Sequence, residues 1–277
     1  MKLLPSQKKI LAFLIIIVLV SGCARNHQFI NGQASSQETE LGDIIHRQIL
    51  QTVPIYPEQT LNDYIQNVGH RIASNADRKG LIYRFIILED DRVYATFAPG
   101  GYIYITTGFF SFLQSEIELA GTLAYEIAAL QYKDPRLSHL KKSFDFILMT
   151  GSYVAPAFGA IGALSVIGLA LVGAATSGEK SRLKRIEEAD AKALRYLSES
   201  GYDPQGLINL LFRMNDPTSP YRAYLYDYLQ SHPIDFVRLA KLDEEFQKLP
   251  MENKHFDAGR DSFLIKTEIV RNTFAKK

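Results

Sequence analysis

The stretch ELAGTLAYEIAA, residues 118–129, lies within an unbroken helical pattern that runs from Ser115 to Tyr132. Apolar side chains recur along this pattern at steps of three and four residues and form one stripe: Leu119, Leu123, Ile127 and Leu130. This spacing is typical of a helix that packs one face against a protein core. The sequence therefore predicts a core helix near the middle of the chain.

Two segments upstream of this helix have the composition of β-strands. Residues Tyr83–Leu88 and Tyr102–Thr107 are rich in β-branched and aromatic side chains. They are bounded by the acidic run Glu89–Asp91 and by the turn-forming run Pro99–Gly101. Segments of this kind, closed by charged residues or by Pro and Gly, predict strands of a small sheet.

Helical patterns continue on both sides of these strands and of the central helix. The range Glu40–Ala76 has apolar residues at helical spacing and predicts two amphipathic helices, separated around Pro54 and Pro57. The pattern returns at Arg182–Ser200 and is closed by Gly201–Pro204, where a Gly and then a Pro end the helix. The predicted fold class is therefore α+β, mainly helical, with a small β-sheet.

Composition excludes several classes of function. The 277 residues include 31 Lys and Arg against 30 Asp and Glu, so the net charge gives no indication of a nucleic-acid partner. The single cysteine, Cys23, rules out a disulfide within the chain and a zinc site built from several cysteines. Nothing in the sequence resembles the Gly-x-Ser-x-Gly turn of a serine hydrolase.

The first 22 residues have the layout of a secretory signal peptide. Three lysines precede an apolar run, Ile10–Val20, which is short for a membrane span, and the sequence Ser21-Gly22-Cys23 follows. A small-residue pair before a lone Cys resembles the lipobox of bacterial lipoproteins, and this resemblance implies a lipid on Cys23. The alternative, an uncleaved N-terminal membrane anchor, stays open.

The residues after Cys23 predict where the protein resides. Ala24 stands where an Asp would be the usual signal for retention in the inner membrane, so the resemblance implies a lipid anchor in the outer membrane facing the periplasm. Residues 23–39 are polar, with several Asn, Gln and Ser, and predict a flexible tether. The remaining residues, 40–277, form the predicted folded domain.

One long segment of that domain is apolar. Residues 146–178 contain no charged side chain, and the part from 153 to 175 is long enough in principle to cross a bilayer. Several glycines and Pro156 favour a bent helical hairpin that packs on the domain or dips into lipid. A true membrane span remains the alternative.

Five motifs together resemble one family of enzymes. In order they are FAPGGYIYITTG at 97–108, the stretch at 118–129, EEAD at 187–190, GYDP at 201–204 and His-Pro at 232–233. Their order and spacing, over about residues 40–242, resemble the HtpX and CAAX prenyl protease group of membrane-associated zinc metallopeptidases, especially its periplasmic lipoprotein branch of the BepA and LoiP type. The resemblance implies a thermolysin-like (zincin) metallopeptidase domain.

The same resemblance implies a degenerate metal site. Active relatives bind zinc through two His of an HExxH helix and a Glu of a later helix, and the Glu of HExxH acts as general base. Here Tyr125 and Ala129 stand in place of the two His, and Ile186 stands in place of the third ligand. Only Glu126, the residual general-base position, is kept. We therefore expect no metal and no cofactor, although zinc serves the active relatives.

The remaining site residues are also carried over from the resemblance. In relatives, the Asp at the position of Asp190 bonds a zinc-binding His; that His is missing here, so we expect Asp190 to pack or cap a helix. His232 aligns with a His that lies near the zinc in relatives. Tyr102, Ile103, Tyr104 and Ile105 correspond to a strand that lines the substrate, which we expect at the edge of the sheet and able to pair with an extended peptide.

These observations predict a non-catalytic, metallopeptidase-like lipoprotein. We expect it to bind polypeptides as a chaperone or adaptor in envelope protein assembly or quality control, and to contact the membrane through Cys23 and through residues 146–178. One alternative is an active zinc endopeptidase whose site is rearranged around Glu126, Glu187 or Glu188, and His232. Another is a structural lipoprotein of a membrane complex.

Overall fold

The computed structural model describes residues 32, 34–131, 179–250 and 259–275. Cys23, the predicted signal peptide, most of the predicted tether and the apolar run 146–178 lie outside these residues. Within the described residues, no helix combines the length and the apolar character that a membrane crossing requires.

The sheet has three strands in the order β1-β3-β2, with β1 at Arg84–Leu88, β2 at Ala95–Ala98 and β3 at Tyr102–Thr106. β1 runs parallel to β3, whereas β2 runs antiparallel to it. Gly100 and Gly101 make the turn between β2 and β3 with φ angles of 80° and 95°, which favour glycine. The two predicted strands are confirmed as β1 and β3.

The prediction that the strand Tyr102–Ile105 lies at the edge of the sheet is wrong. These residues form most of β3, the middle strand, whose two sides pair with β1 and β2. Its backbone donors and acceptors are therefore used within the sheet and are not free for a peptide. Among the described residues, the sheet ends instead at β1 and at β2.

The two helices predicted in the range Glu40–Ala76 are α2, Ser36–Leu50, and α3, Gln59–Ala73. α2 begins earlier than the sequence predicted, within the proposed tether. The hydroxyl of Ser35 accepts a hydrogen bond of 3.1 Å from the Glu38 amide and so caps the helix. The folded domain therefore includes residues that the sequence assigned to the tether.

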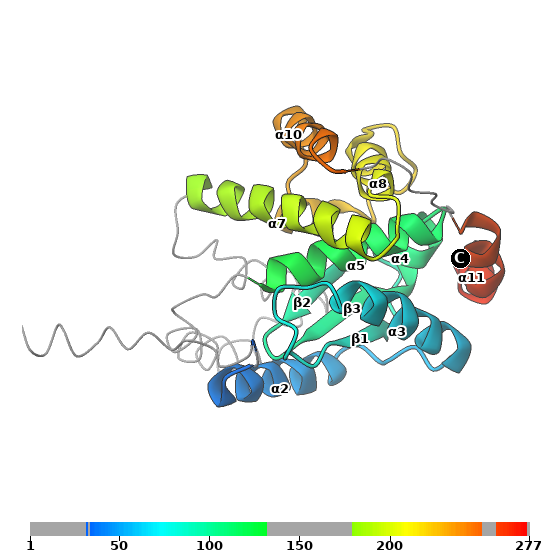
Figure 1. Cartoon of the computed structure of the whole chain (residues 1–277). Coiled ribbons are helices and arrows are strands. Elements are labelled where there is room, and N and C mark those ends of the chain that lie inside the picture. The colour runs from blue at the N-terminus through cyan, green and yellow to red at the C-terminus, as the bar shows by residue number, and fades with distance from the viewer. Residues whose placement is uncertain (1–31, 33, 132–178, 251–258, 276–277) are drawn as a thin grey trace, which may run out of the picture. The chain divides into compact units, whose positions relative to one another are not determined.

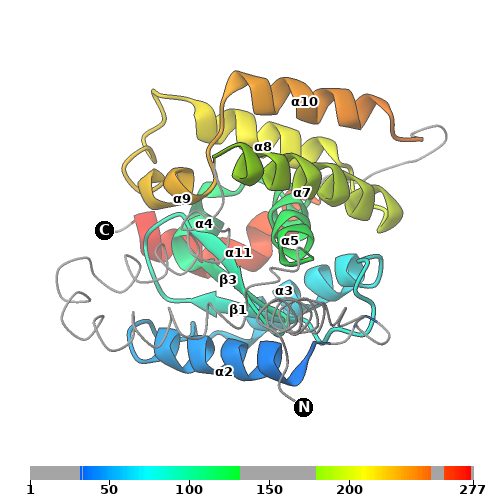
Figure 2. The same ribbon diagram turned by 90° about the vertical axis from the view of Figure 1, so that its left-hand side faces the viewer.

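The remaining helices surround the predicted central helix, α5 (Glu116–Leu130). They are α4 (Thr107–Phe112), α7 (Glu179–Glu199), α8 (Gln205–Asn215), α9 (Tyr226–Ser231), α10 (Phe236–Gln247) and α11 (Arg260–Ala275). Both views show α5 between the sheet and the layer of α7, α8 and α10, with α2 on the far side of the sheet (Figures 1 and 2). The mainly helical α+β fold class is confirmed.

The burial of α5 exceeds the prediction of one buried stripe. Thirteen of its fifteen residues are buried, including Glu118, Tyr125 and Glu126. The helix packs against α7, α8, α3 and β2, which cover it on several sides. Small residues allow this close approach: a Cβ added to Gly121 would lie 2.9 Å from the Cα of Leu207 in α8. The candidate site is consequently enclosed in the core.

Candidate functional site

The carboxyl group of Glu126 lies inside the protein and has no hydrogen-bond partner among the described residues. Its side chain is 0% exposed, and neither oxygen finds a partner among the residues that the structure describes. Burial raises the pKa of Glu126 to about 8, although the nearby Arg238 charge opposes this shift. At neutral pH the carboxyl group is therefore mostly protonated, and a protonated acid cannot act as a general base.

His232 lies beside Glu126 in the segment between α9 and α10. Its Nε2 atom is 3.5 Å from Glu126 Oε1, and its ring stacks on the Tyr228 ring at 4.2 Å between centroids. Its Nδ1 atom lies 2.9 Å from Ser231 Oγ and 3.2 Å from the Tyr228 carbonyl. Burial and the Arg238 charge lower the pKa of His232 to about 3, so the ring is neutral.

The Tyr228 carbonyl favours one tautomer of His232. A carbonyl oxygen only accepts hydrogen bonds, so the tautomer that donates to it carries its hydrogen on the Nδ1 atom. The Nε2 atom then presents a lone pair toward Glu126. Two neutral groups, a protonated acid and an imidazole, therefore face each other at the position of the degenerate metal site that the resemblance implied.

Tyr125 fills the neighbouring space with its ring. The ring meets the His232 ring edge-on, with centroids 5.5 Å apart, and the Arg238 guanidinium carbon lies 5.1 Å from its centroid. Burial raises the pKa of Tyr125 above its ordinary value, so the phenol keeps its proton. A protonated phenol beside a cation is a poor ligand for zinc.

Asp190 and Arg238 form a buried ion pair next to these rings. The guanidinium donates two hydrogen bonds of 2.8 Å to the carboxylate and a third, of 2.9 Å, to the Pro233 carbonyl. Burial disfavours the charge on Arg238, but Asp190, Tyr125 and Tyr228 together outweigh this effect and raise the pKa of the guanidinium above its ordinary value. Asp190 thus joins α7 to α10, in keeping with a helix-packing role.

Sequence reasoning did not identify Arg238. A signal was present, because an Asp whose usual His partner is absent needs another partner once the helix that carries it is buried. Arg238 comes six residues after His232, in the first turn of α10. Only the packing of α10 against α7 showed that this arginine meets Asp190.

The other former ligand positions also offer nothing to a metal. Ala129 is partly buried and lies one turn beyond Tyr125 in α5, whereas Ile186 in α7 is 3% exposed. Neither side chain has a donor atom for zinc. Within the described chain, no group of three His, Cys, Asp or Glu residues is placed to hold a metal ion. The residues at this position therefore do not fit zinc.

The rearranged site considered as an alternative is not assembled. Glu187 pairs with Lys241 of α10, and Glu188 lies 3.7 Å from Lys184 on the exposed face of α7. Neither carboxylate contacts Glu126 in the part of the chain that the structure describes. His232 alone is brought to Glu126, and two side chains do not complete a catalytic zinc site.

Comparison with known proteins places this site within one family. The model for peptidase family M48 matches residues 59–246, from α3 to α10. The chain is 25% identical over 223 residues to the putative beta-barrel assembly-enhancing protease of Vibrio cholerae, which covers 77% of this chain and 45% of that protein. The beta-barrel assembly-enhancing protease of Escherichia coli K12 is 25% identical over 245 residues, or 84% of this chain and 48% of that protein.

A third relative, the beta-barrel assembly-enhancing protease of Yersinia pestis, is 25% identical over 213 residues, or 74% of this chain and 43% of that protein. The chain thus spans less than half the length of the curated relatives it matches. The names of these relatives agree with the BepA-like branch predicted from the five sequence motifs. Because the family model covers more than half of the chain, including every residue of the candidate site, the chain belongs to peptidase family M48.

Proposed function

We propose that this chain is a non-catalytic M48 protein that binds polypeptides during envelope protein assembly or quality control. One observation carries the proposal: Glu126 is buried, with its pKa raised to about 8, while Tyr125, Ala129 and Ile186 supply no metal ligand. Peptide hydrolysis by this family type requires a metal to activate water and a carboxylate to take its proton. Neither condition is met by these side chains.

The edge of the sheet at β2 supports polypeptide binding. The Tyr94 carbonyl accepts a 3.0 Å hydrogen bond from the Thr106 amide, so Tyr94 faces β3. In an antiparallel pair, residues whose backbone groups bond the partner strand alternate with residues whose backbone groups point away from it. The backbone groups of Ala95 and Phe97 therefore face the outer edge of the sheet. Just before β2, at the same outer edge, the Val93 amide donates a hydrogen bond of 3.0 Å to the Tyr224 carbonyl.

An extended polypeptide could add to this edge as a further strand. The residues of β2 are buried, so access requires the neighbouring chain, including the loop at Tyr224, to move aside. The relatives are named for enhancing the assembly of β-barrels, whose unfolded chains are rich in strand-forming segments. We therefore assign β2, in place of β3, as the peptide-binding strand.

The proposed location follows from the leader. Residues 1–22 act as a signal peptide, Cys23 carries lipid in the outer membrane, and the domain faces the periplasm on a tether that ends before Ser35. Residues 146–178 either pack on the domain or enter the lipid as a second contact with the membrane. This arrangement brings the β2 edge to the compartment through which outer-membrane polypeptides pass.

Metal analysis and a protease assay test the catalytic half of the proposal. The purified protein should contain far less than one zinc per chain and should leave casein intact, because no set of three ligands remains. A stoichiometric zinc content together with casein cleavage that a chelator abolishes would establish an active peptidase and refute the proposal.

Photo-crosslinking tests the binding half. A photoreactive phenylalanine analogue at Phe97, beside the β2 edge, should crosslink to newly exported outer-membrane polypeptides in cells. The matched control places the same analogue at Phe212, which is 53% exposed on α8. Equal crosslinking from both positions would indicate a non-specific surface, and adducts with a single stable envelope complex would indicate the structural lipoprotein instead.

A further inference from the structure

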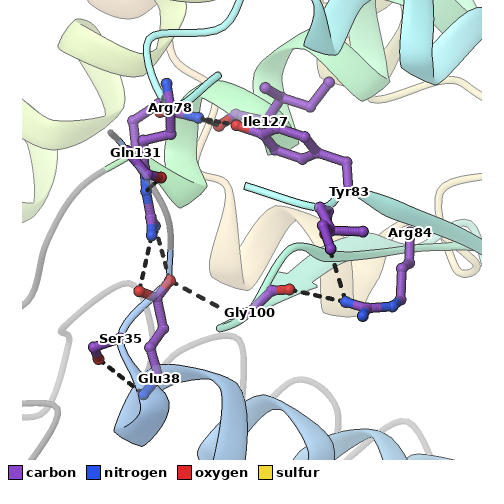
Figure 3. A network of polar contacts seen from close by, with 10 residues as sticks. Ser35, Glu38, Arg78, Tyr83, Arg84, Gly100, Ile127 and Gln131 are labelled. Atoms are coloured by element: carbon purple, nitrogen blue, oxygen red, sulfur yellow. Dashed lines mark hydrogen bonds and ion pairs between the residues drawn. The ribbon is translucent and has the colours of Figure 1, made fainter. Parts of the chain in front are cut away.

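Glu38, in the first turn of α2, is a buried carboxylate whose two oxygens both accept hydrogen bonds. The residue is 3% exposed. Its two oxygens each accept a 2.8 Å hydrogen bond from the Arg78 guanidinium, and one oxygen also accepts from the Gly100 amide at 3.4 Å. Figure 3 shows the carboxylate pointing away from α2, between Arg78 and the turn that contains Gly100. A charge placed in such a position is costly unless it is fully paired.

The turn between β2 and β3 is held from two sides. Glu38 binds the amide of Gly100, while the Arg84 guanidinium of β1 donates to the Gly100 carbonyl at 3.2 Å. The backbone of α2 also touches this turn, because a Cβ added to Gly42 would lie 2.0 Å from the Pro99 carbonyl oxygen. The N-terminal half of α2 therefore sets the position of the turn, and the turn sets where β2 ends.

Arg78 extends the same contacts to the end of α5. Its backbone amide donates to Gln131 Oε1 at 3.1 Å, and Gln131 in turn donates from Nε2 to the Tyr83 hydroxyl and the Ile127 carbonyl, both at 2.8 Å. Gln131 is the C-cap of α5, the helix that carries Glu126. Figure 3 shows this continuous series of polar contacts from α2 to the C-terminal end of α5.

We propose that Glu38 is a positioning residue that, through Arg78 and Gly100, fixes the first helix, the edge strand β2 and the end of α5 in one arrangement. The inference rests on the proposed function only in assuming that β2 receives a polypeptide. Apolar contacts of α2, from Leu41, Ile45 and Ile49, bury the helix but are non-directional. The bidentate ion pair of Glu38 and Arg78 fixes the orientation of the helix, because the two parallel hydrogen bonds between guanidinium and carboxylate require a specific geometry.

Native-state hydrogen exchange of the full-length protein tests this assignment with Glu38→Gln. Amides of α2, of the turn Pro99–Gly101 and of β2 should exchange faster by on the order of 100-fold or more, since the neutral amide of Gln cannot replace the Glu38 carboxylate in the buried pair with Arg78. Amides of α8 should be unchanged. The matched control is Asp77→Asn, because the neighbouring Asp77 makes half-exposed ion pairs with Lys192 and Arg195 of α7 and, within the described chain, none with α2.

A double variant, Glu38→Gln with Arg78→Gln, keeps the test decisive if the single variant unfolds, because it leaves no unpaired charge. In the double variant, amide exchange in α2, the turn and β2 should again increase more than exchange in α8. This increase should be smaller than in the Glu38→Gln protein. Faster exchange in α2 alone, or an equal rise in all elements including α8, would overturn the positioning role.

A binding measurement separates this inference from the proposed function. With an unfolded outer-membrane polypeptide as probe, crosslinking from the analogue at Phe97 should fall in the Glu38→Gln protein and persist in the Asp77→Asn protein. If the unaltered protein gives no crosslink while the exchange pattern is as expected, the proposed function fails and the positioning role stands. Undiminished crosslinking in the Glu38→Gln protein would reject the positioning role.

Discussion

Two buried glutamates, Glu38 and Glu126, have opposite surroundings. Glu38 is 3% exposed and its carboxylate meets Arg78 and the Gly100 amide, whereas Glu126 is 0% exposed and its oxygens find no partner among the described residues. Burial penalises both charges, so an unpaired carboxyl group responds by keeping its proton. The contrast distinguishes a carboxylate that joins parts of the fold from a buried carboxyl group whose described neighbours Tyr125, Ala129 and Ile186 supply no metal ligand.

The largest expected effect comes from restoring the lost ligands around Glu126. The triple variant Tyr125→His, Ala129→His, Ile186→Glu should take up about one zinc per chain, because three ligands and an open position make a catalytic zinc site. Apparent binding free energies of structural zinc are about 10 kcal/mol or more, so thermal stability should rise strongly with zinc. Elemental analysis and melting with and without a chelator measure both effects.

A matched control is the protein with only Tyr125→His, which should remain metal-free because one added His gives no chelate. If the triple variant folds and still takes up no zinc, the alignment of α5 and α7 with the zinc-binding helices of the family is wrong. In that case Glu126 would be an ordinary core residue and the contrast with Glu38 would lose its functional meaning.

The next effect concerns Glu38 itself. Glu38→Ala should lower the free energy of unfolding by about 3–5 kcal/mol, because it removes the carboxylate that pairs with the buried Arg78 guanidinium. Urea denaturation measures this loss. Asp77→Ala, one residue from Arg78, should cost about 1 kcal/mol or less, because its ion pairs are half exposed. Equal losses in the two variants would mean that burial does not distinguish these ion pairs.

The same contrast shows what sequence could and could not predict. Helical and strand spacing predicted α2, α3, α5, α7, β1 and β3, because each has a run long enough to display its period. β2 has only four residues and no alternation of polar and apolar side chains, so it was missed, and with it the order of the strands. Without β2, β3 was taken as an edge.

The polar pairs were harder to predict than the elements. Glu38 stands among Ser, Gln and Thr residues and resembled part of a solvated tether, because its partner Arg78 lies forty residues away in sequence. Asp190 and Arg238 are forty-eight residues apart. Local periodicity carries no information on such distant pairs, whereas Tyr125, Ala129 and Ile186 were found because a family motif fixes their positions.

A pH-dependent gain in stability is expected from Glu126→Gln. The folded pKa of Glu126 is about 8 and its ordinary value is 4.5, so the unfolded chain releases this proton first as pH rises. The native protein therefore loses stability between these two values, by a few kcal/mol in total. Gln carries no proton to release and removes that loss.

Urea denaturation at about pH 5 and about pH 8.5 measures this dependence. The advantage of the Glu126→Gln protein over the unaltered protein should be small at the lower pH and on the order of 3 kcal/mol at the higher pH. A gain of equal size at both pH values would show that Glu126 is ionised in the native state. Glu126 and Glu38 would then not differ in charge.

The smallest expected effect comes from His232 and has the opposite direction in pH. Its folded pKa is about 3 and its ordinary value is 6.5, so the unfolded chain gains a proton as pH falls through this window while the native ring stays neutral. The native protein should therefore lose about 2 kcal/mol between about pH 7.5 and about pH 5, a loss that His232→Gln should remove. Gln keeps an amide that can donate to the Tyr228 carbonyl, so the hydrogen bond of the ring is partly retained. Both variants replace one member of the same buried pair, so their effects on stability should not add. If Glu126→Gln also changes the loss of stability between about pH 7.5 and about pH 5, Glu126 and His232 share a proton across their 3.5 Å separation and titrate as a coupled pair.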